Sequence, residues 1–154
     1  WDPHATGSIT GITRGTTAAH IARAMLEGIA LQNADILTAM RKDAGRHLRG
    51  LCVDGGASAN NLLMQMQADV LGVTLRRPTF IQTTALGAVF AAGLGCGMWK
   101  GLKDIGAAWK LDRAFRPRIS AARRKLILDR WHAAITLASG TKRGVLPTDG
   151  RAES

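Results

Sequence analysis

Tyrosine is absent from this chain, and aromatic residues make up only 5% of its 154 residues. Proteins that bind single-stranded nucleic acids stack the bases on aromatic side chains within a basic groove. A net charge of +10 would attract a polyanion such as a nucleic acid. However, residues 110–154 carry 11 basic and only 4 acidic residues, so most of the excess positive charge lies at the C-terminal end. We therefore expect no nucleic-acid partner, and a salt-sensitive basic binder is the weaker alternative.

Cysteine is scarce too, because Cys52 and Cys96 are the only two. Both lie in apolar segments and lack the paired spacing of a zinc site, so we expect buried free thiols and a reducing, cytoplasmic environment. No uninterrupted apolar segment is long enough to cross a bilayer, and no basic and then apolar leader precedes the first expected strand. We therefore expect neither a membrane span nor a signal peptide in this sequence.

Two common catalytic motifs are also missing. No Gly-Lys-Ser or Gly-Lys-Thr sequence occurs, which excludes a Walker loop. The four histidines, His4, His20, His47 and His132, are scattered and suggest no Ser-His-Asp site. His20 stands near an expected helix start, where a structural role is the better interpretation.

The order of apolar and turn-forming segments predicts an α/β fold. With 46% hydrophobic residues, the chain is long enough for one globular domain with a core. Helices and strands should alternate along it. We expect strands at residues 9–13, 51–53 and 73–76, helices at residues 17–45, 59–72, 84–93, 102–109 and 121–137, and an unstructured tail at residues 141–154.

The longest of these helices, residues 17–45, has a broad apolar face at helical spacing. So broad a face predicts deep burial. One stripe contains Ile21, Met25, Ile29, Ile36 and Met40, and the residues beside it are Ala22, Leu26, Ala30 and Leu37.

A strand, a glycine turn and a helix start follow one another in the middle of the chain. Residues 51–53 are apolar and predict a short buried strand. Gly55 and Gly56 permit backbone angles and a close approach that a Cβ would forbid, so a ligand can touch bare backbone there. We expect Ser58 to cap the next helix and Asn60 to lie in its first turn, at the end that attracts anions.

A nucleotide site needs several backbone turns that converge from different loops, and two further segments fit this requirement. Residues 83–88 place two threonines, as expected caps, before a helix of small residues. Residues 7–15 are expected to form a strand bounded by glycines. Asp54, at the strand end before the glycine pair, either caps the turn, which is the preferred interpretation, or reaches magnesium.

These segments resemble the C-terminal part of the FGGY carbohydrate kinases, and within that family the branch of glycerol kinases. The resemblance extends from Trp1 into the last expected helix. It is carried by Gly7-x-Ile9-x-Gly11-Ile12, followed after seven residues by His20-Ile21-x-x-Ala24-Met25-Leu26-Glu27, by Asp54-Gly55-Gly56-Ala57 with Asn60-Asn61, and by Thr84-Ala85-Leu86-Gly87-Ala88.

The resemblance implies an actin-like, ribonuclease-H-like ATPase domain, the C-terminal half of a two-domain sugar kinase that is incomplete on its N-terminal side. It implies ATP and Mg²⁺ as cofactors, with ATP or ADP bound at Gly55, Gly56 and Asn60. By position, Gly56 corresponds to a backbone contact near the phosphates and sugar, and Asn60 to an adenine contact, for which its amide is both donor and acceptor. Glycerol would be held through the upstream domain, in a homo-oligomeric full-length enzyme.

The same resemblance implies that this chain is inactive alone, because the family's catalytic and polyol-binding residues match nothing in it. Residues 1–140 are then a partial kinase domain, followed by a disordered tail at residues 141–154. His4 replaces a common tyrosine and Gln82 a common acid, which affects local contacts only. A kinase of another sugar or polyol and a non-catalytic, actin-like nucleotide-binding module are the alternatives.

Overall fold

The computed structural model describes residues 7–45 and 48–140, which form a mixed α/β structure, as the sequence predicts. His4, His47 and the expected tail at residues 141–154 lie outside the described residues. In chain order the elements are α1 (Ala18–Ala44), β1 (Gly50–Cys52), the 3-10 helix η1 (Gly56–Ala59), α2 (Asn61–Leu71), β2 (Thr74–Pro78), α3 (Thr83–Gly95), α4 (Leu102–Ala108), β3 (Leu111–Phe115) and α5 (Ala121–Gly140).

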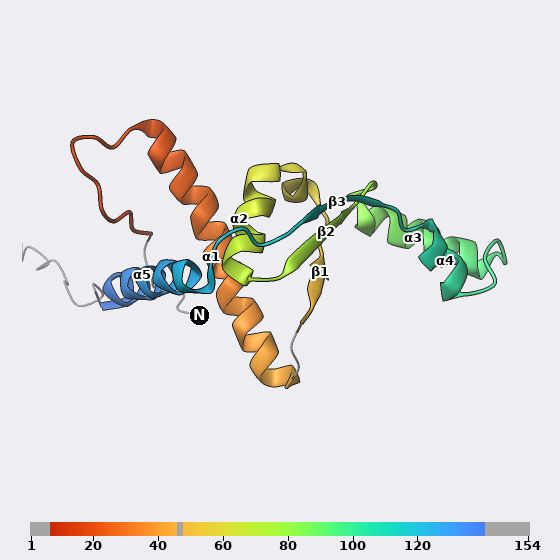
Figure 1. Ribbon diagram of the computed structural model, residues 1–154. Coiled ribbons are helices and arrows are strands. Elements are labelled where there is room, and N and C mark those ends of the chain that lie inside the picture. The colour runs from red at the N-terminus through yellow and green to blue at the C-terminus, as the bar shows by residue number, and fades with distance from the viewer. Residues whose placement is uncertain (1–6, 46–47, 141–154) are drawn as a thin grey trace, which may run out of the picture.

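The sheet has three strands in the order β1-β2-β3 (Figure 1). β1 runs parallel to β2, with Leu51 opposite Leu75, and α2 forms the crossover between them. β3 pairs antiparallel with β2 and places Phe115 beside Leu75. The sequence does not predict β3, because only the two end residues of this strand, Leu111 and Phe115, are large and hydrophobic.

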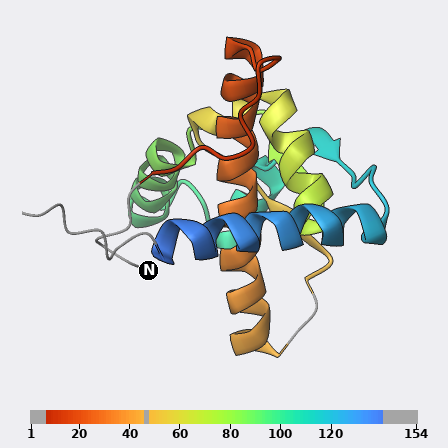
Figure 2. The same cartoon turned by 90° about the vertical axis from the view of Figure 1, so that its left-hand side faces the viewer.

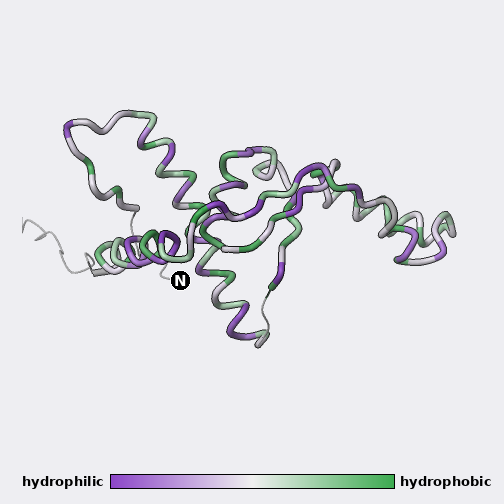
Figure 3. Tube along the Cα trace, viewed as in Figure 1, coloured by the Kyte–Doolittle hydropathy of each residue, from purple (hydrophilic) through white to green (hydrophobic). Residues whose placement is uncertain are grey.

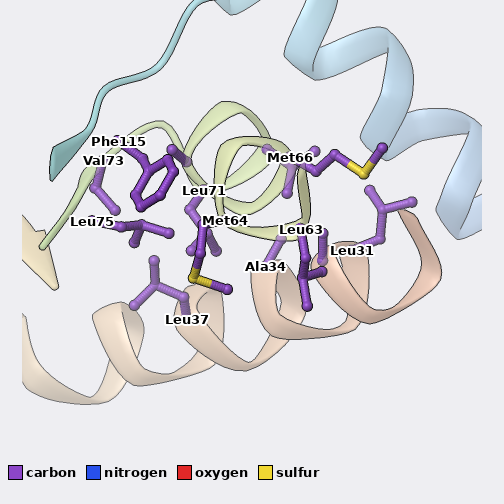
Figure 4. Packing of buried hydrophobic residues seen from close by; sticks show 13 residues of the cluster. Leu31, Ala34, Leu37, Leu63, Met64, Met66, Leu71, Val73, Leu75 and Phe115 are labelled. Atoms are coloured by element: carbon purple, nitrogen blue, oxygen red, sulfur yellow. The ribbon is translucent and has the colours of Figure 1, made fainter. Parts of the chain in front are cut away.

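α2 forms the centre of the hydrophobic core, between α1 on one side and the strands on the other (Figure 4). α5 lies across the middle of α1 (Figure 2), and its Ile127, Leu128 and Trp131 pack against the same core. The buried hydrophobic residues are Ala30, Leu31, Ala34 and Leu37 of α1, Leu63, Met64, Met66, Ala68, Val70 and Leu71 of α2, and Val73, Leu75 and Phe115.

The ends of α1 lie where the sequence predicts them. Thr17 is the N-cap residue, and its backbone N–H donates to Nδ1 of His20 at 3.1 Å, so His20 has the structural role expected of it. Gly45 ends the helix in the left-handed conformation with φ 59°. Glycine adopts this conformation without the steric cost of a Cβ, which is why it so often follows the last helical turn.

The predicted burial of the apolar stripe of α1 is wrong within the described residues. Met25 is 68% exposed and Met40 is 55% exposed. Hydrophobic and hydrophilic residues alternate along this helix (Figure 3), and only the side that faces α2 and α5 is covered. The covered side is formed by Ala30, Leu31, Ala34 and Leu37, whereas Ile29 and Ile36 of the predicted stripe are exposed.

Two other expectations also differ from the structure. Residues 9–13 form no strand, because no described strand runs beside them to take their backbone hydrogen bonds. Cys52 and Cys96 are free thiols, as expected, but both are exposed rather than buried. Cys52 is exposed because successive residues of a strand face opposite sides, and its neighbours Leu51 and Val53 take the side toward the core.

α3 and α4 extend away from the sheet as an arm at one end of the molecule (Figure 1). Within this arm Gly93 is buried, and Trp99 lies so close that a Cβ on Gly93 would clash with its ring. Trp99 also contacts Phe90 edge to face, with 5.2 Å between the ring centroids. Large hydrophobic side chains remain open to solvent along the arm, namely Val89, Met98, Leu102 and Trp109.

Candidate functional site

The predicted glycine turn connects β1 to α2. Val53 continues the pairing beyond β1, because its N–H donates to the carbonyl oxygen of Arg76 at 3.0 Å. The chain then reverses at Gly55, forms η1 and enters α2 after Asn60. Residues 54–60 are called the glycine turn below.

Gly55 and Gly56 have different roles in this turn. Gly55 has φ 78°, a conformation that residues with a side chain rarely adopt, and its N–H donates to the carbonyl oxygen of Ile81 at 2.8 Å. Gly56 is the first residue of η1, so the helix itself provides no partner for its amide. A Cβ added at Gly56 would meet no atom within 4 Å. Gly55 therefore shapes the turn, whereas Gly56 presents open backbone.

Asn60, rather than Ser58, caps α2. The Oδ1 of Asn60 accepts hydrogen bonds from the backbone N–H groups of Leu62 at 3.0 Å and Leu63 at 3.1 Å. Ser58 is buried, and its hydroxyl donates to the carbonyl oxygen of Gly55 at 2.7 Å, so the expected Ser58 cap is wrong. Asn60 thus stands just before the first helical turn in which it was expected, and the cap uses only its oxygen.

Two of the three segments that were expected to converge do meet. The hydroxyl of Thr83, the first residue of α3, donates to the carboxylate of Asp54. Gln82 is the N-cap residue of α3 and makes no side-chain cap, so the expected threonine caps are wrong. Asp54 therefore ties two loops together instead of capping its own turn, which was the preferred interpretation.

The third segment lies elsewhere in the molecule. Residues 7–15 lead into α1 at the opposite end of the molecule from α3 (Figure 1). Thr13 closes a turn there, because its N–H donates to Oγ1 of Thr16 at 2.9 Å instead of to a neighbouring strand. Together with His20 and Ala24, this segment lines a separate hollow of about 420 Å³. The predicted convergence of all three segments on one site is therefore wrong within the described residues.

Arg77 of β2 is a candidate that the sequence does not single out. It donates to the carbonyl oxygen of Ser58 at 2.7 Å, at the end of the glycine turn, and pairs with Asp112 of β3. A shallow hollow of about 240 Å³ lies beside it, lined also by Ala59 and Ile81. In the sequence Arg77 directly follows the strand expected at residues 73–76, and a charged residue at a strand end is common, so its position indicates nothing specific.

The glycine turn has the chemistry of a binding site rather than of a catalytic one. Open backbone at Gly56 and the N-terminal end of α2 favour an anionic or nucleotide ligand. Among the described residues, no group of three or more acidic, histidine or cysteine side chains is arranged to hold a metal ion. The described helices also include none that is long and apolar enough to cross a membrane.

The sequence matches the model of the C-terminal domain of the FGGY family of carbohydrate kinases over residues 1–96. It is 56% identical over 135 residues to a glycerol kinase of Bdellovibrio bacteriovorus and 52% identical over 138 residues to a glycerol kinase of Deinococcus radiodurans. These alignments cover 88% and 90% of this chain but 27% and 28% of the two relatives. The chain thus spans about a quarter of the length of the curated relatives it matches.

Solved structures of the same family share this fold. The crystal structure of Plasmodium falciparum glycerol kinase with ADP aligns with a TM-score of 0.80 and 31% identity, over 90% of this chain and 28% of that protein. A xylulose kinase from Lactobacillus acidophilus aligns with a TM-score of 0.77 over 92% of this chain and 29% of that protein. Its identity is 24%, so this second likeness concerns the fold alone.

Proposed function

Because this chain belongs to the FGGY family of carbohydrate kinases, we propose that it is the nucleotide-binding part of an ATP-dependent glycerol kinase. The complete enzyme would transfer the γ-phosphoryl group of ATP to a hydroxyl of glycerol, giving ADP and glycerol 3-phosphate. The observation that carries the proposal is the 56% identity with a glycerol kinase over 135 residues. Among the solved structures, too, the glycerol kinase is more similar in sequence than the xylulose kinase, at 31% against 24% identity.

We assign the nucleotide to the glycine turn. Gly55 gives the turn its shape through its positive φ, and the open surroundings of Gly56 let its amide approach the phosphate and sugar side of ATP or ADP. Asn60 would contact adenine with the amide nitrogen that its helix cap leaves available. The positive end of α2 adds a favourable field for the phosphates.

Catalysis is assigned to the remainder of such a kinase. Phosphoryl transfer needs a carboxylate beside the acceptor hydroxyl and metal ions on the phosphates. The described residues hold no cluster of metal-ligating side chains, and Asp54 is engaged with Thr83, so they do not fit a protein-held Mg²⁺ site. Mg²⁺ would therefore be bound through ATP and residues outside this chain.

The open apolar faces support an assembly with those further residues. The exposed side chains on α1, Met25, Ile29, Ile36 and Met40, recur at helical spacing along one side of the helix, and Val89 on α3 is exposed as well. An exposed apolar stripe of this kind marks an interaction site. We propose that these faces pack against the remainder of the kinase. We also propose that residues 1–140 are the domain part and residues 141–154 a dispensable tail, and that the complete enzyme is a cytoplasmic homo-oligomer.

A coupled ADP-release assay tests the proposal. The chain is assayed with ATP, Mg²⁺ and glycerol, first alone and then mixed with the upstream three quarters of the Bdellovibrio bacteriovorus glycerol kinase, the part that this chain does not match. We expect no glycerol-dependent ADP release from the chain alone and measurable release from the mixture. The upstream part alone is the control. Glycerol-dependent turnover by the chain alone would contradict the assignment of catalysis to the remainder of the enzyme.

A further inference from the structure

Arg77 contacts the glycine turn from the neighbouring strand. Its Nη1 donates to the carbonyl oxygens of Ser58 at 2.7 Å and Ala59 at 3.3 Å, and to Oδ1 of Asn61 at 3.0 Å. On its other side, Nε and Nη2 lie 2.8 Å and 2.7 Å from Oδ2 of Asp112. The side chain is only 11% exposed. One guanidinium thus joins the end of η1, the start of α2 and β3.

Arginine suits this position for a physical reason. The last carbonyl groups of a helical turn have no partner within the turn, and hydrogen bonds from a charged donor are stronger than those from a neutral one. The planar guanidinium presents five N–H donors in a rigid fork and so reaches acceptors along both of its edges, whereas the three donors of a lysine ammonium all start from one nitrogen. Phe115 adds a surface for the guanidinium, with 5.3 Å from its carbon to the ring centroid. The contacts of Arg77 therefore fix the position and the orientation of the glycine turn relative to β2 and β3.

We infer that Arg77 is a positioning residue for the nucleotide site, which rests on the proposed function. Its donors point to protein acceptors and its side chain is nearly enclosed, so it acts through the turn rather than by contacting ATP. Within the turn, Gly56 is the first residue of η1 and Asn60 follows its last residue. A binding site has to be held within about 0.5 Å of its productive geometry. Loss of the Arg77 contacts would displace the Gly56 amide and the Asn60 side chain together.

Arg113 provides a matched control. It is an exposed arginine on β3 whose guanidinium also lies over the Phe115 ring, at 5.1 Å from the centroid. No hydrogen bond from Arg113 to the glycine turn occurs among the described residues. Arg77→Met and Arg113→Met each remove one positive charge and one contact with the same ring. Only Arg77→Met removes the contacts with the turn.

Two measurements on the chain test the inference. Amide hydrogen exchange by NMR follows Ser58 and Asn60, whose N–H groups donate to the carbonyl oxygens of Gly55 and Ala57. Calorimetric titration with ADP measures the affinity of the proposed nucleotide site. In Arg77→Met we expect at least tenfold faster exchange of both amides relative to the α2 core amides, and about tenfold weaker ADP binding. Arg113→Met should match the wild type in both measurements.

Arg77→Lys keeps the positive charge and replaces Arg77→Met in both measurements if Arg77→Met does not fold. We expect its exchange rates and its ADP affinity to lie between those of the wild type and those expected for Arg77→Met. Exchange ratios in the Arg77 variants equal to those of Arg113→Met would overturn the inference. The inference would also be overturned if Arg77→Met exchanged faster but bound ADP as tightly as the wild type, while Asn60→Asp bound ADP more weakly. That result would leave the proposed nucleotide site intact. ADP affinity that is unaffected by Asn60→Asp would instead contradict the proposed nucleotide site, while the exchange ratios still decide whether Arg77 holds the turn.

Discussion

Asn60 has two separable roles, and substitutions can divide them. Its Oδ1 caps α2 through the N–H groups of Leu62 and Leu63. Its amide nitrogen is the group proposed to contact adenine. Asn60→Ala removes both, whereas Asn60→Asp keeps an acceptor oxygen for the cap and lacks the amide donor. Aspartate is as good an N-cap residue as asparagine, and its charge is favourable at the N-terminal end of a helix.

The expected magnitudes follow from these contacts. Loss of the cap in Asn60→Ala should cost about 1 kcal/mol of unfolding free energy, within the usual range for such caps. For a chain of this length, 1 kcal/mol corresponds to a fall in Tm of roughly 2–4 °C. In both Asn60→Ala and Asn60→Asp the adenine edge loses its hydrogen-bond partner, which should weaken the free energy of ADP binding by ~1–3 kcal/mol. Asn60→Asp should therefore keep the Tm of the wild type and still bind ADP about 5-fold to 150-fold more weakly.

Thermal unfolding and calorimetric titration with ADP are measured on the wild type and both variants. Asn60→Ser is the neutral control, because serine also caps helices but lacks an amide group and carries no charge that could repel the phosphates. We expect Asn60→Ser to bind ADP as weakly as Asn60→Asp. If Asn60→Asp and Asn60→Ser bind ADP as tightly as the wild type, Asn60 does not contact the nucleotide and its role is the helix cap alone.

The two glycines should respond differently to alanine: Gly55→Ala forces a side chain into φ 78° and should destabilise the fold by about 1–2 kcal/mol, measured by urea unfolding. Gly56→Ala has space for its Cβ, so it should leave stability unchanged and weaken ADP binding in titration; unchanged affinity would contradict a close approach of the ligand. Asp35→Ala removes the carboxylate that accepts from Nε1 of Trp131 at 2.7 Å and should cost about 1–3 kcal/mol in the same unfolding assay. Asp129→Ala, which breaks only an exposed ion pair with Lys125 within α5, is its control, and equal effects of the two substitutions would show that the hydrogen bond between α1 and α5 adds no stability.

The sequence by itself determines the local features of this chain. Gly45 and Gly72 end α1 and α2 in the left-handed conformation, with φ 59° and 65°, because that conformation excludes most other residues. The apolar residues before Gly55 and the helical spacing after Asn60 likewise place a strand, a turn and a helix in the correct order. Each of these features depends on residues within a few positions of one another, so a single sequence contains the information.

Which residue performs the cap depends on finer geometry than composition reveals. Ser58 and Asn60 are both good N-cap residues, and η1 decides between them. Because η1 forms one extra turn after Gly55, the hydroxyl of Ser58 donates back to the Gly55 carbonyl, and α2 begins two residues later than a Ser58 cap would require.

Only the tertiary structure decides which surfaces meet. α1 has apolar residues on more than one side, and packing against α2 selects Ala30, Ala34 and Leu37 for burial while Met25 stays exposed. β3 exists because β2 offers it a partner edge, not because its own residues favour a strand strongly. The contact of Asp54 with Thr83 joins residues 29 positions apart, and that of Arg77 with Asp112 joins residues 35 positions apart. Periodicity and propensity carry no information about such pairs, because they describe neighbours along the chain, whereas these contacts form only when the sheet brings distant segments together.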